Sequence, residues 1–439
     1  MPNHPVDDRS DLDVLSTAER MKFHQRSLLR LWDLAIRHPL TRRRFPQYQA
    51  AEPTPENIFA KWSEIPPDSA TDHLPCIRKE GEYRAFHTNG IEARIVCSSG
   101  GSTGKPKLLV SAYEEALCNA SYQGKGYRRA GITAHDTVAT FGGSGTFAID
   151  YGVYHALAQV GCTIVPFVDF HRAEENCEVL EMLRINVLLA LPSKLYPLIS
   201  YLEERGRKLE NVRLVVTGGE PLSCQLKSRL MARCGTALAF GSTFCTSDHG
   251  AIGYQCSRCG DGEYHLHEGM QYVELVASEE GGSPNELVVS NLRWSYMPVV
   301  RLRTGDCAEW TDYRGDCLCG KTSRKIRLLG RMADTISIGG AKINGRWFSE
   351  LPGRVGIHEN LMHVLVRTGC DGRDVVEIAL NGSLRDRYEK ALRSALMENA
   401  TFARIVREQR VIGPHFVTET DGMENTSGYG KLKVLRDMR

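Results

Sequence analysis

The chain carries at residues 98–105 the stretch Ser98-Ser99-Gly100-Gly101-Ser102-Thr103-Gly104-Lys105. A run of small residues cannot pack a core, but it leaves backbone N–H groups and hydroxyls free to converge on an anion. Lys105 adds a positive charge where the small residues end. The stretch therefore predicts a phosphate-binding loop, with a flexible surface turn as the alternative.

The residues around this loop exclude the helix-forming loop of P-loop nucleotidases. That loop follows the pattern G-x-x-x-x-G-K-[ST], whereas here position 99 is Ser and Lys105 is followed by Pro106. The apolar run that begins at Leu108 then predicts a strand rather than a helix. We therefore expect the loop to join two strands of a hairpin that closes over phosphates.

Short apolar runs recur downstream of the loop, and helix-like segments follow them. Strands that alternate with helices build a parallel sheet covered on both faces, so this order predicts an α/β fold with mostly parallel sheets in the large domain. Closely spaced strand-like segments after residue 263 predict an antiparallel β subdomain at 263–330. The runs lie at 137–141, 163–168, 187–191 and 214–217, and the later segments at 272–276 and 286–290.

The two ends of the chain have patterns of their own. Leu28, Leu31 and Trp32 recur at helical spacing, which predicts a helical N-terminal region at 1–62. Two strand-like segments before a helix-like one predict a small α+β C-terminal domain at 331–439. We expect a large domain at 1–330 and a mobile small domain after it, with the boundary near residues 330–334.

Bulk composition excludes several classes of partner. The 439 residues include 55 basic and 53 acidic ones, and a net charge of +2 gives no general attraction to nucleic acid or to anionic membranes. No apolar run reaches the roughly 18 residues that span a bilayer, and the polar, acidic N-terminus does not resemble a signal peptide. The sequence therefore predicts a cytoplasmic protein with small-molecule partners, and it leaves a homodimer open.

A second glycine-containing segment, Gly218-Gly219-Glu220-Pro221-Leu222, directly follows the run at 214–217. Paired glycines at the carboxyl end of a parallel strand let the backbone approach a flat ligand closely. The alternative is a helix-start turn with Glu220 near the N-cap. A third segment, Phe240-Gly241-Ser242-Thr243, follows in the same part of the chain.

In chain order these segments resemble the motifs of the adenylate-forming superfamily, which includes acyl-CoA synthetases, peptide-synthetase adenylation domains and luciferases. The resemblance implies ATP as a substrate, with loop 98–105 on its phosphates. It implies an adenine pocket lined by Gly219, Glu220 and Pro221. Phe240, Gly241, Ser242 and Thr243 resemble the aromatic-Gly-x-Thr-Glu motif, in which Thr contacts phosphate and Glu holds Mg²⁺.

One position of that motif departs from the family pattern. Phe244 stands where the family has the Mg²⁺-binding Glu. Asp248 is the carboxylate that could take over this role if the loop is longer than usual. The alternative is that Asp248 is a solvated loop residue, so the sequence leaves the Mg²⁺ ligand open.

A ribose ligand is predicted from the segment Pro298-Val299-Val300-Arg301-Leu302-Arg303-Thr304-Gly305-Asp306, which resembles P-x-x-R-Y-R-T-G-D with Leu302 in place of Tyr. An Asp after Thr-Gly at a strand end can accept both ribose hydroxyls, and an Asp in an ordinary β-turn is the alternative. The next segment, Gly330-Arg331-Met332-Ala333-Asp334, resembles the family's hinge motif. There the resemblance implies that Arg331 contacts ribose and phosphate, although Ala333 replaces an acidic residue.

The last predicted motif lies near the C-terminus, in Ser427-Gly428-Tyr429-Gly430-Lys431-Leu432-Lys433. It resembles the family segment whose lysine enters the site during adenylation. Lys431 matches that catalytic position, and Lys433 is the alternative. Without the resemblance, a basic tail of this kind would be read as solvated.

Two cysteine pairs stand apart from the other cysteines of the chain. Cys256 and Cys259 precede His265, and Cys317 and Cys319 follow about sixty residues later. Thiolates with imidazole suit tetrahedral Zn²⁺, and turn cysteines without metal are the alternative. The segment resembles phenylacetate–CoA ligase-like enzymes, which implies a structural zinc bound by His265, Cys317, Cys319 and either Cys256 or Cys259.

The resemblance implies ATP-dependent activation of a carboxylic acid as an acyl-adenylate, followed by transfer to a thiol, most often that of coenzyme A. The first alternative is an amine acceptor, which gives an amide ligase. The second is a nucleotide-binding scaffold without catalysis, motivated by Phe244, Leu302 and Ala333. The segment 141–147 favours a flat or aryl acid, with core packing of its aromatic residues as the alternative.

Overall fold

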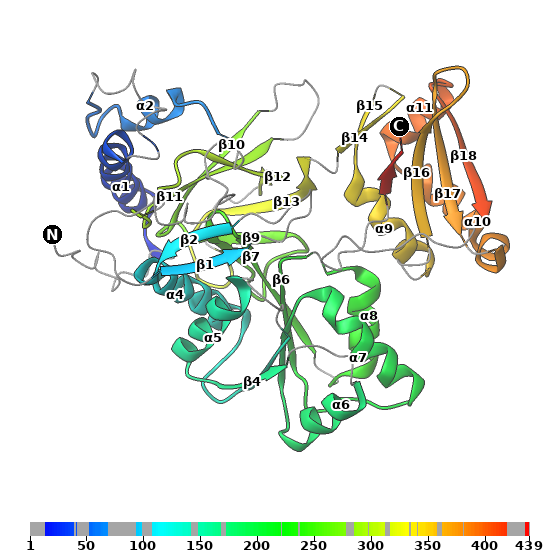
Figure 1. Ribbon diagram of the computed structural model, residues 1–439, viewed down its shortest axis with the longest axis horizontal. Coiled ribbons are helices and arrows are strands. Elements are labelled where there is room, and N and C mark those ends of the chain that lie inside the picture. The colour runs from blue at the N-terminus through cyan, green and yellow to red at the C-terminus, as the bar shows by residue number, and fades with distance from the viewer. Residues whose placement is uncertain are drawn as a thin grey trace.

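The computed structural model describes most of the chain. It describes residues 14–38, 41, 52–68, 94–98, 108–141, 148–167, 173–220, 222–235, 238–277, 285–296, 298–311, 317–332, 335–339, 341–357, 362–380, 382–418 and 435–438. The N-terminal helices lie at one end of the molecule, the C-terminal segment lies at the other, and a large sheet lies between them (Figure 1).

The predicted parallel sheet is present. It runs in the order β7-β6-β5-β3-β4, and every neighbouring pair in it is parallel. We call this part of the molecule the parallel half. Its strands are β3 (Thr137–Phe141), β4 (Thr163–Phe167), β5 (Val187–Ala190), β6 (Leu214–Gly218) and β7 (Ala239–Thr246).

Helices cover both faces of the parallel half because its strand side chains alternate between two apolar layers. Leu188 and Val215 pack with helices on one face, whereas Leu189 and Val216 pack with helices on the other. Each such leucine or valine contributes about 1.5–3 kcal/mol when buried. The first face carries α6 (Ala173–Met182), α7 (Pro192–Glu204) and α8 (Cys224–Arg233), and the second carries α4 (Tyr113–Ala130) and α5 (Ala148–Val160).

The antiparallel strands continue the same sheet. Eleven described strands form one sheet in which β7 pairs antiparallel with β8, and the order then continues through β9, β13, β12 and β11 to β10. We call this part the antiparallel half, and it begins at Gly250, ahead of the predicted start at 263. Its strands are β8 (Gly250–Tyr254), β9 (Glu263–Leu266), β10 (Gln271–Val276), β11 (Glu286–Asn291), β12 (Leu302–Trp310) and β13 (Lys325–Arg331).

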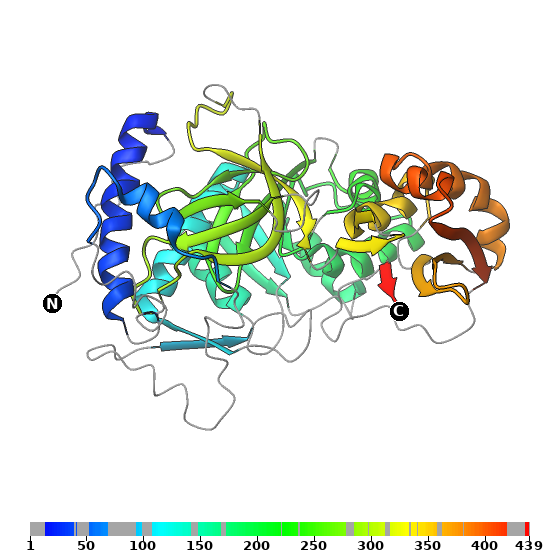
Figure 2. The same ribbon diagram turned by 90° about the horizontal axis from the view of Figure 1, so that it is seen from above.

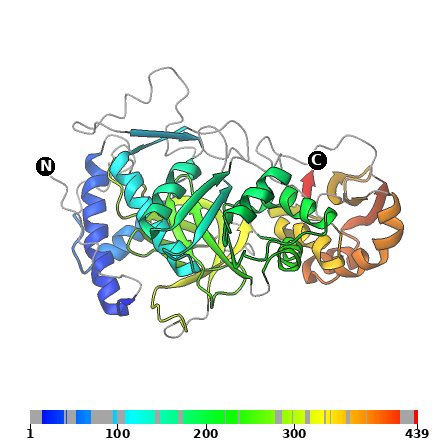
Figure 3. The ribbon, with the colours of Figure 1, turned by 90° about the horizontal axis from the view of Figure 1, so that it is seen from below.

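The predicted hairpin around the small-residue loop is also present. β1 (Arg94–Ser98) pairs antiparallel with β2 (Leu108–Ala112), and Ser98 stands opposite Leu108 where the loop leaves the strands. The hairpin lies beside α4 and α5, along one side of the molecule (Figure 3). Pro106 and the apolar run that begins at Leu108 therefore indicated the correct secondary structure.

The N-terminal region contributes two described helices that pack on the antiparallel half. α1 (Thr17–Arg37) begins with a capping box, in which Ser16 and Glu19 satisfy each other's backbone N–H groups. α2 (Ile58–Glu64) follows. Leu28, Trp32 and Trp62 form a buried cluster with residues of the antiparallel half, so this region shares a core with the sheet.

The C-terminal segment has a core of its own, at the end of the molecule opposite α1 (Figure 2). It contains a sheet in the order β18-β17-β16-β19 and a separate β14–β15 pair. None of the described helices, here or elsewhere, combines the length and apolar character that a bilayer crossing requires. The elements are β14 (Thr335–Ile338), β15 (Ala341–Asn344), α9 (Gly345–Val355), β16 (Met362–Thr368), β17 (Asp374–Leu380), α10 (Gly382–Leu396), α11 (Ala400–Arg407), β18 (Val411–Thr418) and β19 (Leu435–Asp437).

Candidate active site and metal centre

Two of the predicted segments meet at the carboxyl end of the parallel half. Gly218, the last residue of β6, stands opposite Thr243 of β7. A Cβ atom added to Gly218 would lie 3.0 Å from the Thr243 hydroxyl, a tight contact, so the glycine leaves that oxygen more room than another residue would. Gly219 follows with φ 74°, and it turns the chain out of the strand. This is the strand-end geometry that the sequence predicts for a flat ligand.

The other residues of the Phe240–Thr243 motif face protein rather than a common cavity. A Cβ on Gly241 would lie 2.8 Å from the Ala130 side chain, so Gly241 permits α4 to approach β7. Ser242 is buried, and its hydroxyl lies 3.0 Å from the Tyr264 hydroxyl. The Lys227 ammonium lies 5.3 Å above the ring of Phe240. Among the described side chains of this motif, Thr243 therefore remains the one suited to a phosphate.

Phe244 occupies the position where the family has an acidic residue, and it belongs to the core. It is 9% exposed, packs with Ile252 and Leu266, and its ring lies 5.7 Å from that of Tyr264. A carboxylate there would be buried among apolar side chains, so the site offers no metal ligand at this position. Asp248 lies in the turn after β7, where one carboxylate oxygen is buried without a hydrogen-bond partner.

A β-bulge positions Asp306, the residue predicted to bind the ribose. Where β12 pairs with β11, Glu286 stands opposite Cys307 but Val288 stands opposite Arg303, so Thr304, Gly305 and Asp306 form a bulge in β12. The Thr304 hydroxyl donates to the Leu287 carbonyl at 3.1 Å. It also accepts the Asp306 N–H at 3.0 Å. These bonds fix the turn before the carboxylate.

The structure brings together two residues that the sequence assigned to the nucleotide separately. Asp306 stands opposite Arg331 across β12 and β13, and the Arg331 Nε atom lies 3.2 Å from an Asp306 oxygen. Asp306 is 8% exposed, whereas the Arg331 side chain is 47% exposed. A mostly buried carboxylate therefore carries a charge-assisted contact from Arg331, the second residue of the predicted hinge.

Several predicted residues lie outside the described residues. These are Ser99, Gly100, Gly101, Ser102, Thr103, Gly104 and Lys105 of the small-residue loop, Pro221, and Lys431 near the C-terminus. Ala333 and Asp334 of the predicted hinge lie outside them as well. Glu220 is described two residues after the end of β6 and is half-buried.

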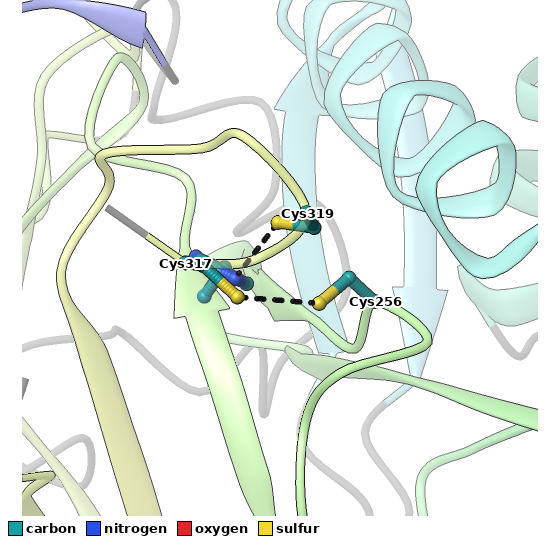
Figure 4. Close-up of side chains that lie close together, drawn as sticks. Cys256, Cys317 and Cys319 are labelled. Carbon is teal, nitrogen blue, oxygen red and sulfur yellow. Dashed lines mark hydrogen bonds between the residues drawn. The ribbon is translucent and has the colours of Figure 1, made fainter.

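The predicted metal ligands converge in the antiparallel half. One donor atom each from Cys256, His265, Cys317 and Cys319 lies within 4.8 Å of the others. The sulfur atoms of Cys256 and Cys317 are 3.9 Å apart, and the Cys319 sulfur is 3.6 Å from the His265 Nε2 atom. A tetrahedral Zn²⁺ with Zn–S bonds of about 2.3 Å spaces its ligand atoms by about 3.5–3.8 Å. The three cysteines converge from two separate segments (Figure 4).

The orientation of His265 also fits a metal ligand. Its Nδ1 atom lies 3.2 Å from the Ser323 carbonyl and 3.0 Å from the Ser323 hydroxyl, and both residues are fully buried. An Nδ1–H that donates to this carbonyl leaves Nε2 unprotonated and directed at the cysteines, as in metal-bound histidines. The sequence did not single out Ser323, although it lies four residues after Cys319.

The geometry distinguishes the two cysteines between which the sequence could not choose. Cys256 belongs to the four-donor group, whereas Cys259 does not. The Cys259 sulfur lies 3.6 Å from that of Cys256, and its side chain is only partly buried. Cys259 is therefore a neighbour of the group rather than one of its four donors.

A buried ion network next to this group was not predicted from the sequence. Glu268 is 1% exposed and lies 2.7 Å from the Arg20 Nη1 atom of α1 and 2.6 Å from the Arg324 Nε atom. Burial raises the pKa of Glu268, but the charges of Arg324 and Arg20 outweigh burial and hold that pKa below its ordinary value. The signal available in the sequence was the acidic Glu268 directly after His265-Leu266-His267, in the buried turn that follows β9.

Comparison with known proteins gives matches along nearly the whole chain. Residues 78–260 match the family described as AMP-binding enzyme. A phenylacetate–coenzyme A ligase of Pseudomonas putida is 25% identical over 337 residues, which are 74% of this chain and 73% of that ligase. An indoleacetate–lysine synthetase of Pseudomonas savastanoi is 29% identical over 135 residues, which are 31% of this chain and 32% of that protein.

Solved structures share the fold. A 2-hydroxyisobutyryl-CoA ligase in its postadenylation state, in complex with 2-HIB-AMP, superposes with a TM-score of 0.76 at 16% identity, covering 99% of this chain and 94% of that one. The same ligase in its thioesterification state superposes with a TM-score of 0.62 at 17% identity, covering 97% and 91%. The matches to the AMP-binding family and to the phenylacetate–coenzyme A ligase confirm the predicted resemblance to adenylate-forming enzymes and to their phenylacetate–CoA ligase-like branch. The solved structures confirm the predicted fold class.

Proposed function

We propose that this relative of the phenylacetate–coenzyme A ligases activates a small carboxylic acid with ATP and transfers the acyl group to the thiol of coenzyme A. The comparisons confirm the reaction class predicted from the motifs, an AMP-forming acid–thiol ligase. The observation that carries the proposal is the strand-end pair of Gly218 and Thr243, which lies inside the matched segment 78–260. This pair forms at the sheet edge where nucleotides bind in α/β folds.

The proposed reaction has two steps. An oxygen of the substrate carboxylate attacks the α-phosphorus of ATP, the bond to the bridging oxygen breaks, and pyrophosphate leaves. The thiolate of coenzyme A then attacks the acyl carbon, and AMP leaves. The protein contributes positioning and charge neutralisation. We therefore assign phosphate contacts to Thr243 and to the loop at residues 98–105. We assign a contact at the α-phosphate to Lys431.

The remaining nucleotide contacts follow from the same assignment. Gly219, Glu220 and Pro221 would lie beside the adenine, and Asp306 would accept the ribose hydroxyls. Arg331 would move from Asp306 toward ribose and phosphate. The burial of the Asp306 carboxylate and its contact with Arg331 support this assignment.

We further propose two domains, at 1–330 and 331–439, that rotate about residues 330–334 between the two steps. The separate core of the C-terminal segment supports this division, as does Gly330, which has φ 114°. Rotation would replace the adenylation face by one that admits the thiol.

We assign a structural rather than a catalytic role to Zn²⁺. Four protein donors, from Cys256, His265, Cys317 and Cys319, leave no coordination position open for a substrate. Mg²⁺ would enter with ATP, and Phe244 cannot bind it because that side chain lies in an apolar core. We route no step through either ion.

The acceptor and the compartment are parts of the proposal as well. An amine acceptor is the second candidate, favoured by the match to the indoleacetate–lysine synthetase over 135 residues.

A cytoplasmic location suits the cysteines, since every cysteine whose side chain is described is unbridged. Size-exclusion chromatography would test for a homodimer.

Release of pyrophosphate tests the reaction. The full chain with ATP and Mg²⁺ should release pyrophosphate when a panel of aryl and short aliphatic acids is added one at a time. If no acid raises the rate above background while ATP still binds, the protein is a nucleotide-binding scaffold and the proposal fails. Consumption of coenzyme A with the active acid distinguishes a thioester ligase from an amide ligase.

The variant Lys431→Ala tests the assigned lysine. We expect adenylation to slow by roughly a hundredfold or more, the size of effect seen when one electrostatic contact to a developing charge is lost. The dissociation constant of ATP should stay within about threefold, because the contact is made mainly during reaction. Lys433→Ala is the matched control, and equal turnover of wild type and Lys431→Ala would remove the assignment.

A further inference from the structure

Arg301, five residues before Asp306, has an unusual backbone and a buried side chain. Its φ angle is 43°, in the left-handed region that a residue with a side chain rarely occupies. The residue is 5% exposed, and its N–H donates to the Ser290 hydroxyl at 2.8 Å. A conformation of this kind persists only where the surroundings enforce it.

The guanidinium group of Arg301 joins three segments. Nε lies 3.1 Å from a Glu274 oxygen on β10. Nη1 donates to the Ser63 carbonyl at 2.7 Å and also to the Ile65 carbonyl. Two of these acceptors lie at the C-terminal end of α2, Ser63 in its last turn and Ile65 directly after it, in a part of the molecule that precedes the matched segment 78–260.

The backbone around Arg301 makes a second connection to the same segment. Asp68 donates its N–H to the Arg301 carbonyl at 2.9 Å, and the Asp68 carbonyl accepts the Arg303 N–H at 2.8 Å. These bonds form a parallel bridge between Asp68 and Leu302. The N-terminal segment thus fixes both the direction and the register of β12 at its first residue.

The position of Asp306 follows from that register. Leu302 and Arg303 stand opposite Val289 and Val288 of β11, after which the bulge of Thr304 to Asp306 begins. The start of the bulge is set by Arg301 and Asp68, and its end by the pairing of Asp306 with Arg331. A displacement at Arg301 would therefore turn the carboxylate away from the position it holds.

We propose that Arg301 is a positioning residue for ribose recognition, and that residues 63–68 form the brace against which it acts. The inference rests on the proposed function, since it assumes that Asp306 accepts the ribose hydroxyls. Arg301 touches no nucleotide. It holds the strand that presents Asp306, and a lysine cannot replace it because a single ammonium cannot bridge Glu274, Ser63 and Ile65 in the same planar arrangement.

Equilibrium binding of ATP, 2′-deoxy-ATP and 3′-deoxy-ATP to the full chain tests the inference without turnover. A hydrogen bond between a hydroxyl and a carboxylate contributes roughly tenfold or more in affinity, so wild type should prefer ATP over each deoxy compound by about that factor. In Arg301→Lys the preference should fall to about twofold or less. Binding of the deoxy compounds should change by less than about threefold, since they lack the contact. Asp306→Asn gives the preference of a site without the carboxylate.

Arg20→Lys is the matched control. Arg20 is also a buried arginine that ties the N-terminal region to the sheet, but it does so at Glu268 and the Thr322 carbonyl. It should lower the melting temperature and keep the preference within about twofold of wild type. If Arg301→Lys keeps the wild-type preference, or if Arg20→Lys loses it to the same degree, Arg301 is merely structural and the inference is wrong.

Ser290→Ala covers the case in which Arg301→Lys does not fold. It removes only the hydroxyl that accepts the Arg301 N–H, and it should reduce the preference for ATP to about half. An unchanged preference in this variant also contradicts the inference. Wild type that binds ATP but releases no pyrophosphate contradicts the proposed reaction alone, and the binding ratios still decide on Arg301. Wild type without any preference for ATP overturns the inference.

Discussion

The parallel and antiparallel halves belong to one sheet, yet different forces hold them. Five described polar or charged side chains are buried between Leu108 and Thr246, against eleven between His249 and Arg331. The interior of the parallel half is apolar on both faces of its strands. The antiparallel half buries Glu268, Arg301 and the four-donor group of the proposed zinc site, and α1 and α2 are attached to it.

This difference indicates how each half responds to a change of conditions. Apolar burial depends little on pH or chelators. Buried ions and metal ligands are stable only while every partner is present, because a charge left alone in a low dielectric is costly. When the pH falls or the metal is removed, the antiparallel half should therefore unfold before the parallel half, and the N-terminal helices should detach with it.

Removal of the proposed zinc ion should produce the largest difference in stability between the antiparallel half and the parallel half. Cys317→Ser, or a chelator, should destabilise the antiparallel half by several kcal/mol, since binding energy at a structural zinc is folding energy. Elemental analysis should find one zinc per chain in wild type and less in the variant. Limited proteolysis should then cut near α1 before it cuts the parallel half.

Two controls sharpen this prediction. Cys259→Ser should keep the wild-type zinc content, because the Cys259 sulfur lies outside the four-donor group. Leu188→Ala in the parallel half should cost about 2–5 kcal/mol, with or without chelator. Equal sensitivity of both halves to the chelator would contradict the division of forces.

Glu268→Gln should have the next largest effect. It leaves Arg20 and Arg324 facing a neutral side chain, and breaking a buried ion pair costs about 3 kcal/mol. The matched control is Glu203→Gln, which removes the partner of Arg229 in the helical layer of the parallel half. That pair is more exposed, and its loss should cost about 0.5 kcal/mol. Chemical denaturation of both variants gives the comparison.

Acid should act on the same network with the smallest effect. Burial lowers the pKa of His24 below its ordinary 6.5, and the pKa of Glu268 lies below its ordinary 4.5. Both groups bind protons more readily in the unfolded chain. The stability that they contribute is therefore complete above about pH 6.5 and declines below it, first through His24 and then, below about pH 4.5, through Glu268.

Hydrogen exchange of α1 between pH 7.5 and pH 4 measures this decline. We expect a loss of about 1 kcal/mol in the protection of α1, and little change in β5 or β6 over the same range. In Glu268→Gln the part of the decline below about pH 4.5 should disappear. Exchange in α1 that does not depend on pH would show that neither group supports the docking of that helix.

The sequence was most informative where each residue's environment is local. The runs at 137–141 and 187–191 predicted buried parallel strands because apolar side chains point to both faces there. Pro106 predicted a strand rather than a helix after the loop. The start of the antiparallel strands at Gly250 was missed because β8 is short, contains two glycines and lacks a clear alternation. Its continuity with β7 depends on pairing between strands.

The sequence indicated site residues whose motif neighbours lie close along the chain, and it missed contacts between residues that are far apart in the sequence. Thr243, Asp306 and Arg331 stand within recognisable motifs. The choice of Cys256 over Cys259 needed the position of Cys317, which lies about sixty residues away in the sequence. Ser63, a partner of Arg301, and Arg20, a partner of Glu268, each lie more than two hundred residues away, in the N-terminal region. Periodicity carries no information over such separations.

The tryptophans are distributed unevenly between the two halves of the sheet, so intrinsic fluorescence reports on one half and not on the other. All five lie outside 108–250, at Trp32, Trp62, Trp294, Trp310 and Trp347. Trp32 and Trp62 are buried together with ring centres 6.4 Å apart, and the Arg324 guanidinium lies 4.6 Å above Trp310. Intrinsic fluorescence should therefore respond to detachment of the N-terminal helices and to loosening beside the proposed zinc site. It should remain largely silent about the parallel half, so that emission and circular dichroism followed together would separate the two events in a single sample.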